Sequence, residues 1–170
     1  MKNADYYVKS LSLLPHPEGG FYREIFRSKE QVTQAALPER YKGDRNFLTS
    51  IYFLLRSEDI SAFHRIKSDE LWYYHAGSMV EIYLLNEKGL ETVKLGPDIE
   101  NGEVFQAIVP KETWFAAKVK EQNTFTLVSC AVAPGFDFAD FELAKKDELL
   151  KLFPEEKEIV ERMSIKQDSF

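Results

Sequence analysis

Short segments of strand type, separated by turn residues, fill the chain from Leu48 to Ala133, and no other feature constrains the fold as strongly. The segments are rich in β-branched and aromatic residues, and connections such as "NEKG", "PKE" and "KEQN" have the composition of turns. Such a run predicts an all-β sandwich or barrel. The predicted strands are LTSIYFLLR, ISAFHRI, ELWYYHAG, MVEIYLLN, LETVKLG, VFQAIVP, TWFAAKV and FTLVSCAVA, and the last, apolar on both faces, is expected to be central.

The N-terminal region predicts one short helix and one further strand. Asn3 can cap a helix that ends at Pro15, because its side chain can accept from a free amide of the first turn. The prolines and glycines of "PHPEGG" then impose a turn, and "GGFYREIFRS" alternates as a strand does. On this strand we expect Arg23 and Arg27 to share one face. The polar residues 29–46 predict a mobile loop rather than a linker between domains.

The C-terminal region predicts helices that pack on the barrel. "PGFDFADFEL" is expected to form a lid, with Asp137 or Asp140 capping the helix that follows. Pro154 separates two apolar stripes, because proline ends one helix or starts the next at no cost. The stripes are Leu149, Leu150, Leu152 and Phe153 in the first helix, and Ile159, Val160 and Met163 in the second.

The composition limits the classes of partner. A chain of 170 residues suits one domain, and a formal charge of −6 without a dense basic cluster argues against nucleic-acid binding. Cys130, the only cysteine, fits a reducing compartment and is expected to be a buried small hydrophobic residue. No apolar run approaches the ~20 residues of a membrane span, and the first residues are too polar for a signal peptide. We therefore expect a soluble cytoplasmic protein without a membrane or nucleic-acid partner.

The stretch "FHRIKSDELWYYHAG" carries the candidate chemistry. Residues two apart on a strand share a face, so His64 is expected to point the same way as Ile66, and Glu70 the same way as Trp72 and Tyr74. A histidine and a carboxylate on apolar strands can bind a metal, exchange protons or serve as hydrogen-bonded core groups.

The spacing of His64, Ile66, Glu70 and Gly77 resembles the first motif of the cupin superfamily, in which His-x-His precedes a glutamate and a glycine. "GEVFQAIVPKETWF" resembles the second motif weakly. "PHPEGGFYREIFRS" and "APGFDFADFEL" resemble a small cupin subgroup that is poor in metal ligands. The resemblance implies an all-β jelly-roll barrel, a double-stranded β-helix with an internal pocket, a short N-terminal helix and C-terminal helices.

The same resemblance implies how the chain is organised. It predicts a single cupin domain over residues 1–170, with a barrel core at about 18–135 and a helical cap at 138–165. Because cupin barrels commonly pair, we also expect a homodimer that binds a small-molecule ligand.

Two of the four ligands of metal-bearing cupins are missing. His64 and Glu70 match ligand positions, but Ile66 stands at the second histidine and Phe115 at the last one, and Glu112 replaces the glycine of the second motif. Catalytic zinc normally takes three protein ligands. We therefore expect no metal and no cofactor.

The resemblance to the sugar-nucleotide 3,5-epimerases, which use a histidine base without a metal, implies an isomerase or epimerase acting on a polar, carbohydrate-like ligand. "SAFHR" replaces their Arg-Gly-x-His stretch. His64 is the expected base, Glu70 its orienting partner, and Tyr74 or Tyr52 the acid. The expected ligand-binding residues are the stacking aromatics Trp72 and Phe63, the forked Arg23 and Arg27, and Glu18.

Other interpretations stay open at this point. His64 can be a core histidine with one hydrogen bond, and Glu70 can form a structural ion pair with Arg65 or Arg56, because a carboxylate is rarely buried unpaired. Trp72 can fill the core instead of lining a pocket. The alternative functions are a non-catalytic metabolite-binding protein and a metal-dependent oxygenase.

Two histidines lie outside the motif. His75 precedes Ala76 and Gly77 and is expected in a turn. His16 or His75 can supply a third metal ligand only by reaching into the pocket from elsewhere in the fold.

Overall fold

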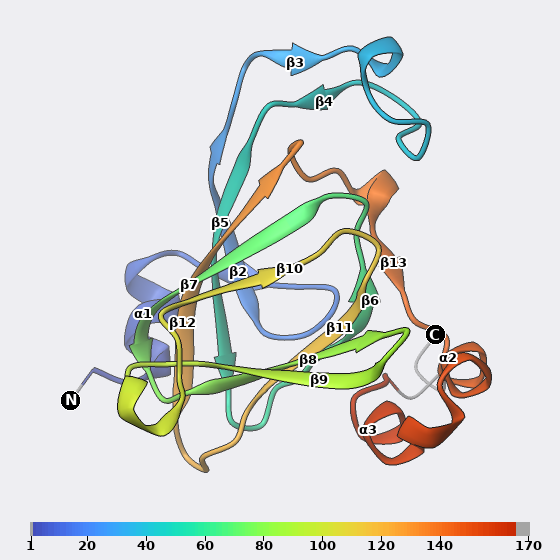
Figure 1. Cartoon of the computed structure of the whole chain (residues 1–170). Helices are drawn as coiled ribbons and strands as arrows, with labels where there is room; N and C mark the ends of the chain where they lie inside the picture. The colour runs from blue at the N-terminus through green and yellow to red at the C-terminus, as the bar shows by residue number, and fades with distance from the viewer. Residues whose placement is uncertain (1, 166–170) are drawn as a thin grey trace.

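Two antiparallel sheets face each other in the structure, a computed structural model that describes residues 2–165 (Figure 1). Most consecutive strands from the fifth to the twelfth alternate between the sheets, which is the winding of a jelly roll. The expected all-β jelly roll is therefore confirmed. The first sheet has the order β1 (Leu14–Pro15), β2 (Phe21–Arg27), β5 (Thr49–Arg56), β12 (Phe125–Ala133), β7 (Asp69–Gly77) and β10 (Gln106–Val109). The second has the order β13 (Glu142–Leu143), β6 (Ser61–Arg65), β11 (Trp114–Val119), β8 (Val80–Asn86) and β9 (Gly89–Leu95).

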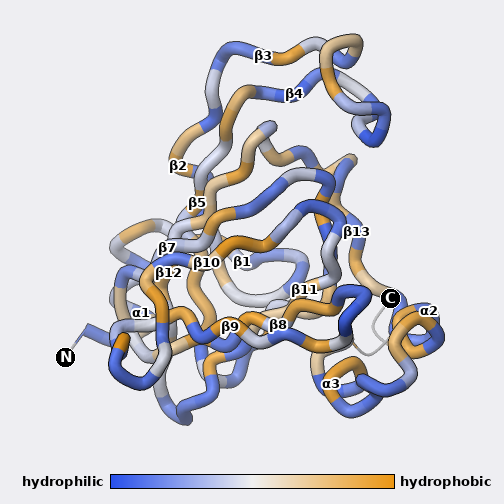
Figure 2. Tube along the Cα trace, viewed as in Figure 1, coloured by the Kyte–Doolittle hydropathy of each residue, from blue (hydrophilic) through white to orange (hydrophobic). Residues whose placement is uncertain are grey.

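The main core lies between the two sheets. Rings and branched side chains from both inner faces pack together there, and hydrophobic stretches follow the strands in Figure 2. Strand β12, which lies between β5 and β7, is almost wholly buried, and this explains its run of apolar residues. Its predicted central place is confirmed. Large members of this core are Phe53, Leu55, Trp72, Ile82, Leu84 and Phe115.

The helices cover the outer faces of the sheets. Helix α1 (Ala4–Ser10) begins as predicted, because the Asn3 side chain accepts a hydrogen bond from the amide of Tyr6 at 3.0 Å. Tyr7 and Val8 of this helix pack against the outer side of the first sheet. Two short C-terminal helices, α2 (Lys146–Leu152) and α3 (Lys157–Arg162), lie beside the second sheet in Figure 1.

The C-terminal helices bury one face of the second sheet, and they explain the place of Phe63. Leu149, Val160 and Met163 form a core cluster with Phe63 and Trp114. Because His64 is the next residue on β6, its side chain points to the opposite face. The expectation that Phe63 stacks on a ligand in the barrel is therefore wrong, since its ring belongs to the cluster under the helices. Short 3₁₀ helices connect the strands and helices at η1 (Gln34–Ala36), η2 (Ile99–Asn101), η3 (Phe138–Asp140) and η4 (Pro154–Glu156).

Residues 29–46, which were expected to form a mobile loop because of their polar composition, form an arm that contains a pair of short strands. Strands β3 (Gln31–Val32) and β4 (Arg45–Asn46) pair with each other and project beyond the barrel in Figure 1. The arm is held at its base by a buried ion pair, in which Arg45 donates to both Asp140 oxygens at 2.6 Å. Such a long-range polar contact leaves no local pattern in the sequence.

No helix among residues 2–165 has the length and apolar character needed to cross a bilayer. The expected cytoplasmic location, homodimer and single domain stay predictions.

Replacing Asp140 with alanine should lower the free energy of unfolding by about 3 kcal/mol, because the Arg45 guanidinium would stay buried without its carboxylate partner. The two side chains are only 5% and 4% exposed. Urea denaturation measures the change. Glu142→Ala is the matched control, because it breaks the surface ion pair between Glu142 and Arg65. The Arg65 and Glu142 side chains are 38% and 51% exposed, so this substitution should lower the free energy of unfolding by less than about 1 kcal/mol. Equal losses in both variants would contradict the assignment.

Candidate functional site

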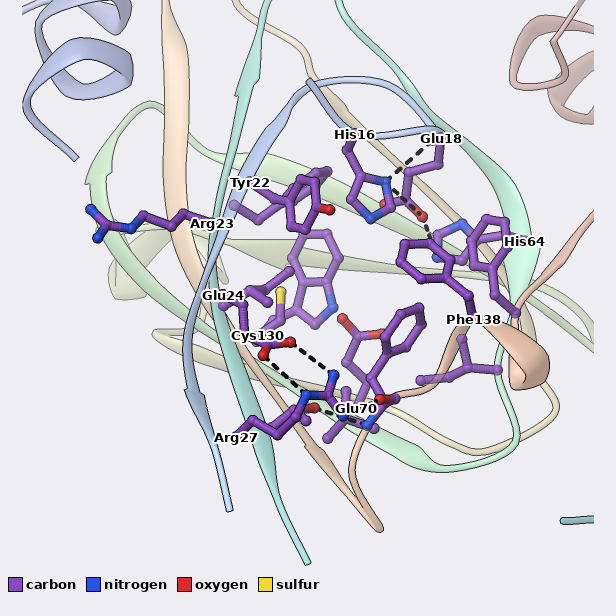
Figure 3. A pocket seen from close by; sticks show the side chains of 18 of the residues that line it. His16, Glu18, Tyr22, Arg23, Glu24, Arg27, His64, Glu70, Cys130 and Phe138 are labelled. Carbon is purple, nitrogen blue, oxygen red and sulfur yellow. Dashed lines mark hydrogen bonds and ion pairs between the residues drawn. The ribbon is translucent and has the colours of Figure 1, made fainter. Parts of the chain in front are cut away.

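A cavity of about 400 Å³ lies between the two sheets (Figure 3). The inner faces of β2, β5, β7 and β12 form one wall, and β6 contributes to the other. Three rings of the predicted lid segment, Phe136, Phe138 and Phe141, line the cavity. The titratable side chains of the interior include His16, Glu18, His64, Glu70 and Cys130, and Arg23, Glu24 and Arg27 also border the cavity.

The turn "PHPEGG" brings Glu18 into the barrel. Gly19 and Gly20 have φ angles of +111° and +74°, a region that residues with a Cβ rarely adopt. A Cβ on Gly19 would also collide with the carbonyl oxygen of Ile60, so only glycine permits this close approach to the β5–β6 connection. The Ala62 amide then donates to the Glu18 carbonyl at 3.0 Å. The turn is thereby fixed against β6, beside His64.

Glu18, and not Glu70, is the carboxylate paired with His64. The His64 Nε2 lies 2.9 Å from Glu18 Oε2, and Ser61 Oγ donates to Glu18 Oε1 at 2.8 Å. Both partners are buried, with 4% and 7% of their side chains exposed. The expectation that Glu70 orients His64 is wrong, because a carboxylate far away in sequence holds that place.

The pair is ionised. Burial lowers the pKa of His64, but the charge and hydrogen bond of Glu18 and the carbonyl of Ala62 raise it more, so the net shift is upward. Burial raises the pKa of Glu18, but His64 lowers it more, and the net shift is downward. His64 Nδ1 donates to the Ala62 carbonyl at 2.8 Å. Both ring nitrogens therefore carry protons and both are engaged, which leaves the imidazolium no lone pair to act as the expected base.

His16 is the neutral histidine of the cavity. Its Nδ1 accepts a hydrogen bond from the Glu18 amide at 3.2 Å, so this nitrogen carries no proton. The 3.8 Å separation between the same Nδ1 and Glu18 Oε2 is therefore not an ion pair. Burial lowers the pKa of His16, and the rings of Tyr22 and Phe53 contact it edge-on at 4.6 and 5.8 Å.

Glu70 is the cavity group whose protonation changes near neutral pH. Burial raises its pKa to about 7, and the charge of Glu18 adds to this, while the positive charge of His64 opposes it. The nearby Cys130 thiol and Trp72 indole also lower the pKa. Cys130 is buried as expected, and burial raises the pKa of its thiol well above the ordinary value.

A β-bulge in β2 separates the two arginines that were expected to share a face. Glu24 pairs with Ile51 and Phe26 with Ser50, so Ile25 is an extra residue that shifts the alternation. The Arg23 guanidinium points away from the cavity in Figure 3 and donates to the carbonyl of Leu11 at 3.0 Å. The predicted forked arginine pair is therefore wrong.

Arg27 instead turns to the cavity rim with Glu24. Its Nε and Nη2 donate to the two Glu24 oxygens at 3.0 and 2.8 Å. Its Nη1 donates to Asn46 Oδ1 at 2.8 Å and to the Phe136 carbonyl at 3.0 Å. Arg27 thus ties β2 to the arm and to the lid, and its charge is already balanced.

The other predicted site residues fall into two groups. Trp72 and Glu18 line the cavity with His64 and Glu70. Tyr52 lies on the opposite face of β5, where its ring contacts His75 at 6.0 Å. The Tyr74 ring packs on the main core, and its hydroxyl donates to the Gly77 carbonyl at 2.6 Å. The structure therefore does not bring either predicted acid into the cavity.

His75 lies within strand β7, not in a turn. Its Nε2 contacts Ser129 Oγ at 2.5 Å on the outer face of the sheet. Burial lowers its pKa. It is too remote from the cavity to join His64 there.

The donors present do not fit the metal centre that the cupin motif implies. Ile66 lines the cavity at one ligand position, and Phe115 stands directly across from His64 at another, with ring centroids 4.0 Å apart. Neither side chain can coordinate a metal. No group of three or more His, Cys, Asp or Glu side chains within residues 2–165 is arranged to hold an ion. Glu112 nevertheless keeps a φ of +59° at the position where the motif has glycine.

A jelly roll with a polar cavity between its sheets defines a cupin-type barrel. The family described as "Cupin superfamily (DUF985)" matches residues 5–144. The chain belongs to this family, as its first motif predicted.

Similar proteins support the same assignment. The structure of protein SO0799 from Shewanella oneidensis is 41% identical, with a TM-score of 0.88, and the match covers 98% of this chain and 100% of that one. A hypothetical protein from Leishmania major is 33% identical, also with a TM-score of 0.88, and covers 97% and 100% of the two chains. An uncharacterised protein of Saccharomyces cerevisiae, YML079W, is 30% identical over 85% of this chain and 76% of its own.

The sequence did not reveal that Glu18 pairs with His64, or that His16 lines the cavity. The available signal was "PHPEGG", whose two adjacent glycines next to a glutamate indicate close backbone packing rather than a simple turn. The bulge at Ile25 had no comparable signal.

The three histidines should titrate separately in NMR spectra recorded against pH. The pKa of His64 should lie above 6.5, and those of His16 and His75 below it. In Glu18→Gln the pKa of His64 should fall below 6.5, because burial remains and the compensating charge is lost. Glu142→Gln, on the surface, should leave all three unchanged. A His64 pKa that is the same in both variants would exclude the ion pair.

Glu70 should make the protein less stable as the pH rises from 4.5 to 7. The unfolded carboxyl loses its proton near pH 4.5, while the folded one keeps it to about pH 7. The folded state binds more protons in this window, so the free energy of unfolding falls, by about 3 kcal/mol in total. Glu70→Gln should remove this fall in urea denaturation series.

His64 changes stability in the same direction but in a different window. Its folded pKa is raised, so its stabilisation is complete below pH 6.5 and is lost as the pH rises through the folded value. His16 and His75, whose folded pKa values are lowered, add stability as the pH rises toward 6.5. The contribution of Glu70 is therefore the difference in slope between the wild-type protein and Glu70→Gln. An unchanged slope in Glu70→Gln would show that this carboxyl is ionised in the folded state.

Proposed function

We propose that the chain binds a small polar metabolite in the cavity and catalyses metal-independent proton transfer at a carbon next to a carbonyl group. This is the chemistry of an isomerase or epimerase, and a keto form of a carbohydrate-like compound is the substrate class. Glu70 exchanges the proton. One observation carries the proposal: a carboxyl group that lines a 400 Å³ cavity has its pKa raised to about 7.

A pKa of about 7 allows Glu70 both to remove a proton from the substrate and to return it. A general base works best when its pKa is near the working pH, because a large fraction is deprotonated and the protonated form can still return the proton. Strong burial and a charged neighbour together are also the usual conditions at catalytic groups. Glu70 has both, since it is 8% exposed and interacts with the charge of His64.

His64 supplies a fixed positive charge in this proposal. Its two N–H groups are held by Glu18 and Ala62, so it neither gives nor takes the proton. Because it interacts electrostatically with Glu70, it also favours negative charge that develops nearby. The role differs from that of the histidine base expected from the 3,5-epimerases.

The proton transfer balances without a further reactant. The Glu70 carboxylate removes the proton from the carbon, the C–H electron pair moves toward the carbonyl oxygen, and an enolate forms. Return of the proton from the Glu70 carboxyl to the same carbon gives an epimer, and delivery to the neighbouring carbon gives an isomer.

A non-catalytic metabolite-binding protein is the second candidate. It is favoured by the internal pairing of Glu18 with His64 and of Glu24 with Arg27, which leaves few polar groups of the cavity free to react. In that case a ligand raises the melting temperature without turnover. A ligand at 100 times its dissociation constant stabilises by about 2.7 kcal/mol, which such a measurement detects.

Incubation in D₂O with carbonyl compounds tests the catalytic proposal. We expect deuterium to appear next to the carbonyl of at least one keto sugar or of tetrahydropyran-4-one, followed by NMR. Glu70→Gln should slow this exchange by about 100-fold or more, the usual contribution of a general base. Glu142→Gln is the matched surface control and should exchange at the wild-type rate.

Two results would contradict the proposal. Exchange that persists in Glu70→Gln would assign the base elsewhere. Thermal stabilisation by a carbonyl compound without exchange would favour the binding protein.

A further inference from the structure

The indole Nε1 of Trp72 is the one buried side-chain nitrogen or oxygen among residues 2–165 that lacks a hydrogen-bond partner. Trp72 is only 1% exposed, so water outside the protein does not reach it. Buried polar groups are almost always paired, because an unpaired donor keeps the full cost of its lost hydration. The N–H therefore needs a partner from the cavity, which is either a bound water or a ligand atom that replaces the water.

The surroundings of Trp72 place this donor at the cavity. Trp72 lines the cavity two residues after Glu70 on β7, so both side chains lie on the same face of the sheet. Phe53 and Phe115 hold the indole ring edge-on, with centroids 5.6 and 6.3 Å away. Cys130 lies opposite Trp72 on the neighbouring strand.

Among residues 2–165, no side chain or carbonyl accepts from the indole N–H with the geometry of a hydrogen bond. Glu70 is the nearest acceptor: the Trp72 N–H lowers the pKa of Glu70 as a hydrogen-bond donor does, although the two groups fall outside the geometry of a well-formed hydrogen bond. The aromatic neighbours and the Cys130 thiol offer no strong acceptor. A ligand atom beside Glu70 is the partner that this arrangement leaves room for.

The charges around the cavity favour an uncharged ligand. The positive charge of His64 is balanced by Glu18 and that of Arg27 by Glu24. Arg23 lines the cavity without a carboxylate partner, but its guanidinium donates to the Leu11 carbonyl and points away from the interior (Figure 3). An anionic ligand deep in the cavity would therefore lie beside the Glu70 carboxyl without a free cation next to it. A cationic ligand would lie beside an N–H donor and the His64 imidazolium.

We propose that the Trp72 Nε1–H group binds the carbonyl oxygen of an uncharged ligand and thereby holds the adjacent carbon next to Glu70. The inference rests on the proposed function for the proton transfer, whereas the binding contact can be tested by itself. Phe136, Phe138 and Phe141 cover the remaining, apolar part of the ligand.

The same hydrogen bond strengthens during the reaction. As the C–H bond breaks, negative charge moves to the carbonyl oxygen, and a donor already aimed at that oxygen stabilises the charge more than it stabilises the neutral group. Loss of a single such donor typically slows a reaction by 100- to 1,000-fold. Loss of Nε1–H should therefore slow exchange more than it weakens binding.

The two tryptophans of the chain make a direct experiment possible. A ¹⁵N-labelled protein gives one indole N–H signal for Trp72 and one for Trp114, and Trp72→Phe assigns them. Four probes share one ring and differ at one position: tetrahydropyran-4-one, tetrahydropyran, 4-aminotetrahydropyran and tetrahydropyran-4-carboxylate. We expect only the ketone to bind with a downfield shift of the Trp72 indole proton, while the Trp114 signal stays in place.

Trp72→Phe should then weaken ketone binding roughly tenfold, the factor that corresponds to about 1.4 kcal/mol. Trp114→Phe is the matched control, because Trp114 lies in the cluster under the C-terminal helices, and it should leave affinity unchanged. The shift in the wild-type protein does not depend on the folding of any variant.

The outcomes separate the two proposals. Binding of the ketone with the expected shift but without deuterium exchange would support the Trp72 contact and contradict proton transfer. Exchange without any Trp72 shift, failure of the ketone to bind, or tighter binding of the ammonium or carboxylate probe would overturn the Trp72 contact.

Discussion

The buried ion pair between Glu18 and His64 is the interaction on which the cavity depends. It joins a turn that precedes β2 to strand β6 of the other sheet, and its two charges are more than nine-tenths buried. Burying charges is costly unless hydrogen bonds satisfy them, and here Ser61 Oγ and the Ala62 carbonyl do so. The pair therefore fixes the N-terminal turn against β6 and favours a positive charge on His64 inside the barrel.

The charge on His64 gives the two titratable groups of the first motif, His64 and Glu70, different protonation behaviour. Glu18 raises the pKa of His64 and so favours its protonated form. Glu70 has no such ion-pair partner, so burial dominates and raises its pKa to about 7. A cupin metal centre would need these two side chains to act alike, as ligands. Ile66 and Phe115 stand where its other donors belong, and the apolar groups instead enclose a space in which a single carboxyl can exchange a proton.

Most of the fold could be predicted because its signals are local. Strand alternation, turn residues and the Asn3 cap each act within a few residues, and the spacing from His64 to Gly77 identified the family. The site was predicted only in part. His64, Glu70 and Trp72 were expected on inner faces and lie there. Arg23 was misplaced because the bulge at Ile25 reverses alternation, and bulges depend on pairing with a partner strand.

The sequence by itself determined the main strands, the inner-face positions of His64, Glu70 and Trp72, and the absence of metal-ligating side chains at two motif positions, because each follows from residue type and short-range periodicity. Only the tertiary structure decided which groups meet. Glu18 lies 46 residues before His64 in the chain, and Arg45 lies 95 residues before Asp140. Their pairing follows from how the sheets fold over each other. The protonation of His64 and Glu70 follows in turn from that pairing, because burial and neighbouring charge set a pKa, and neither is written in the local sequence.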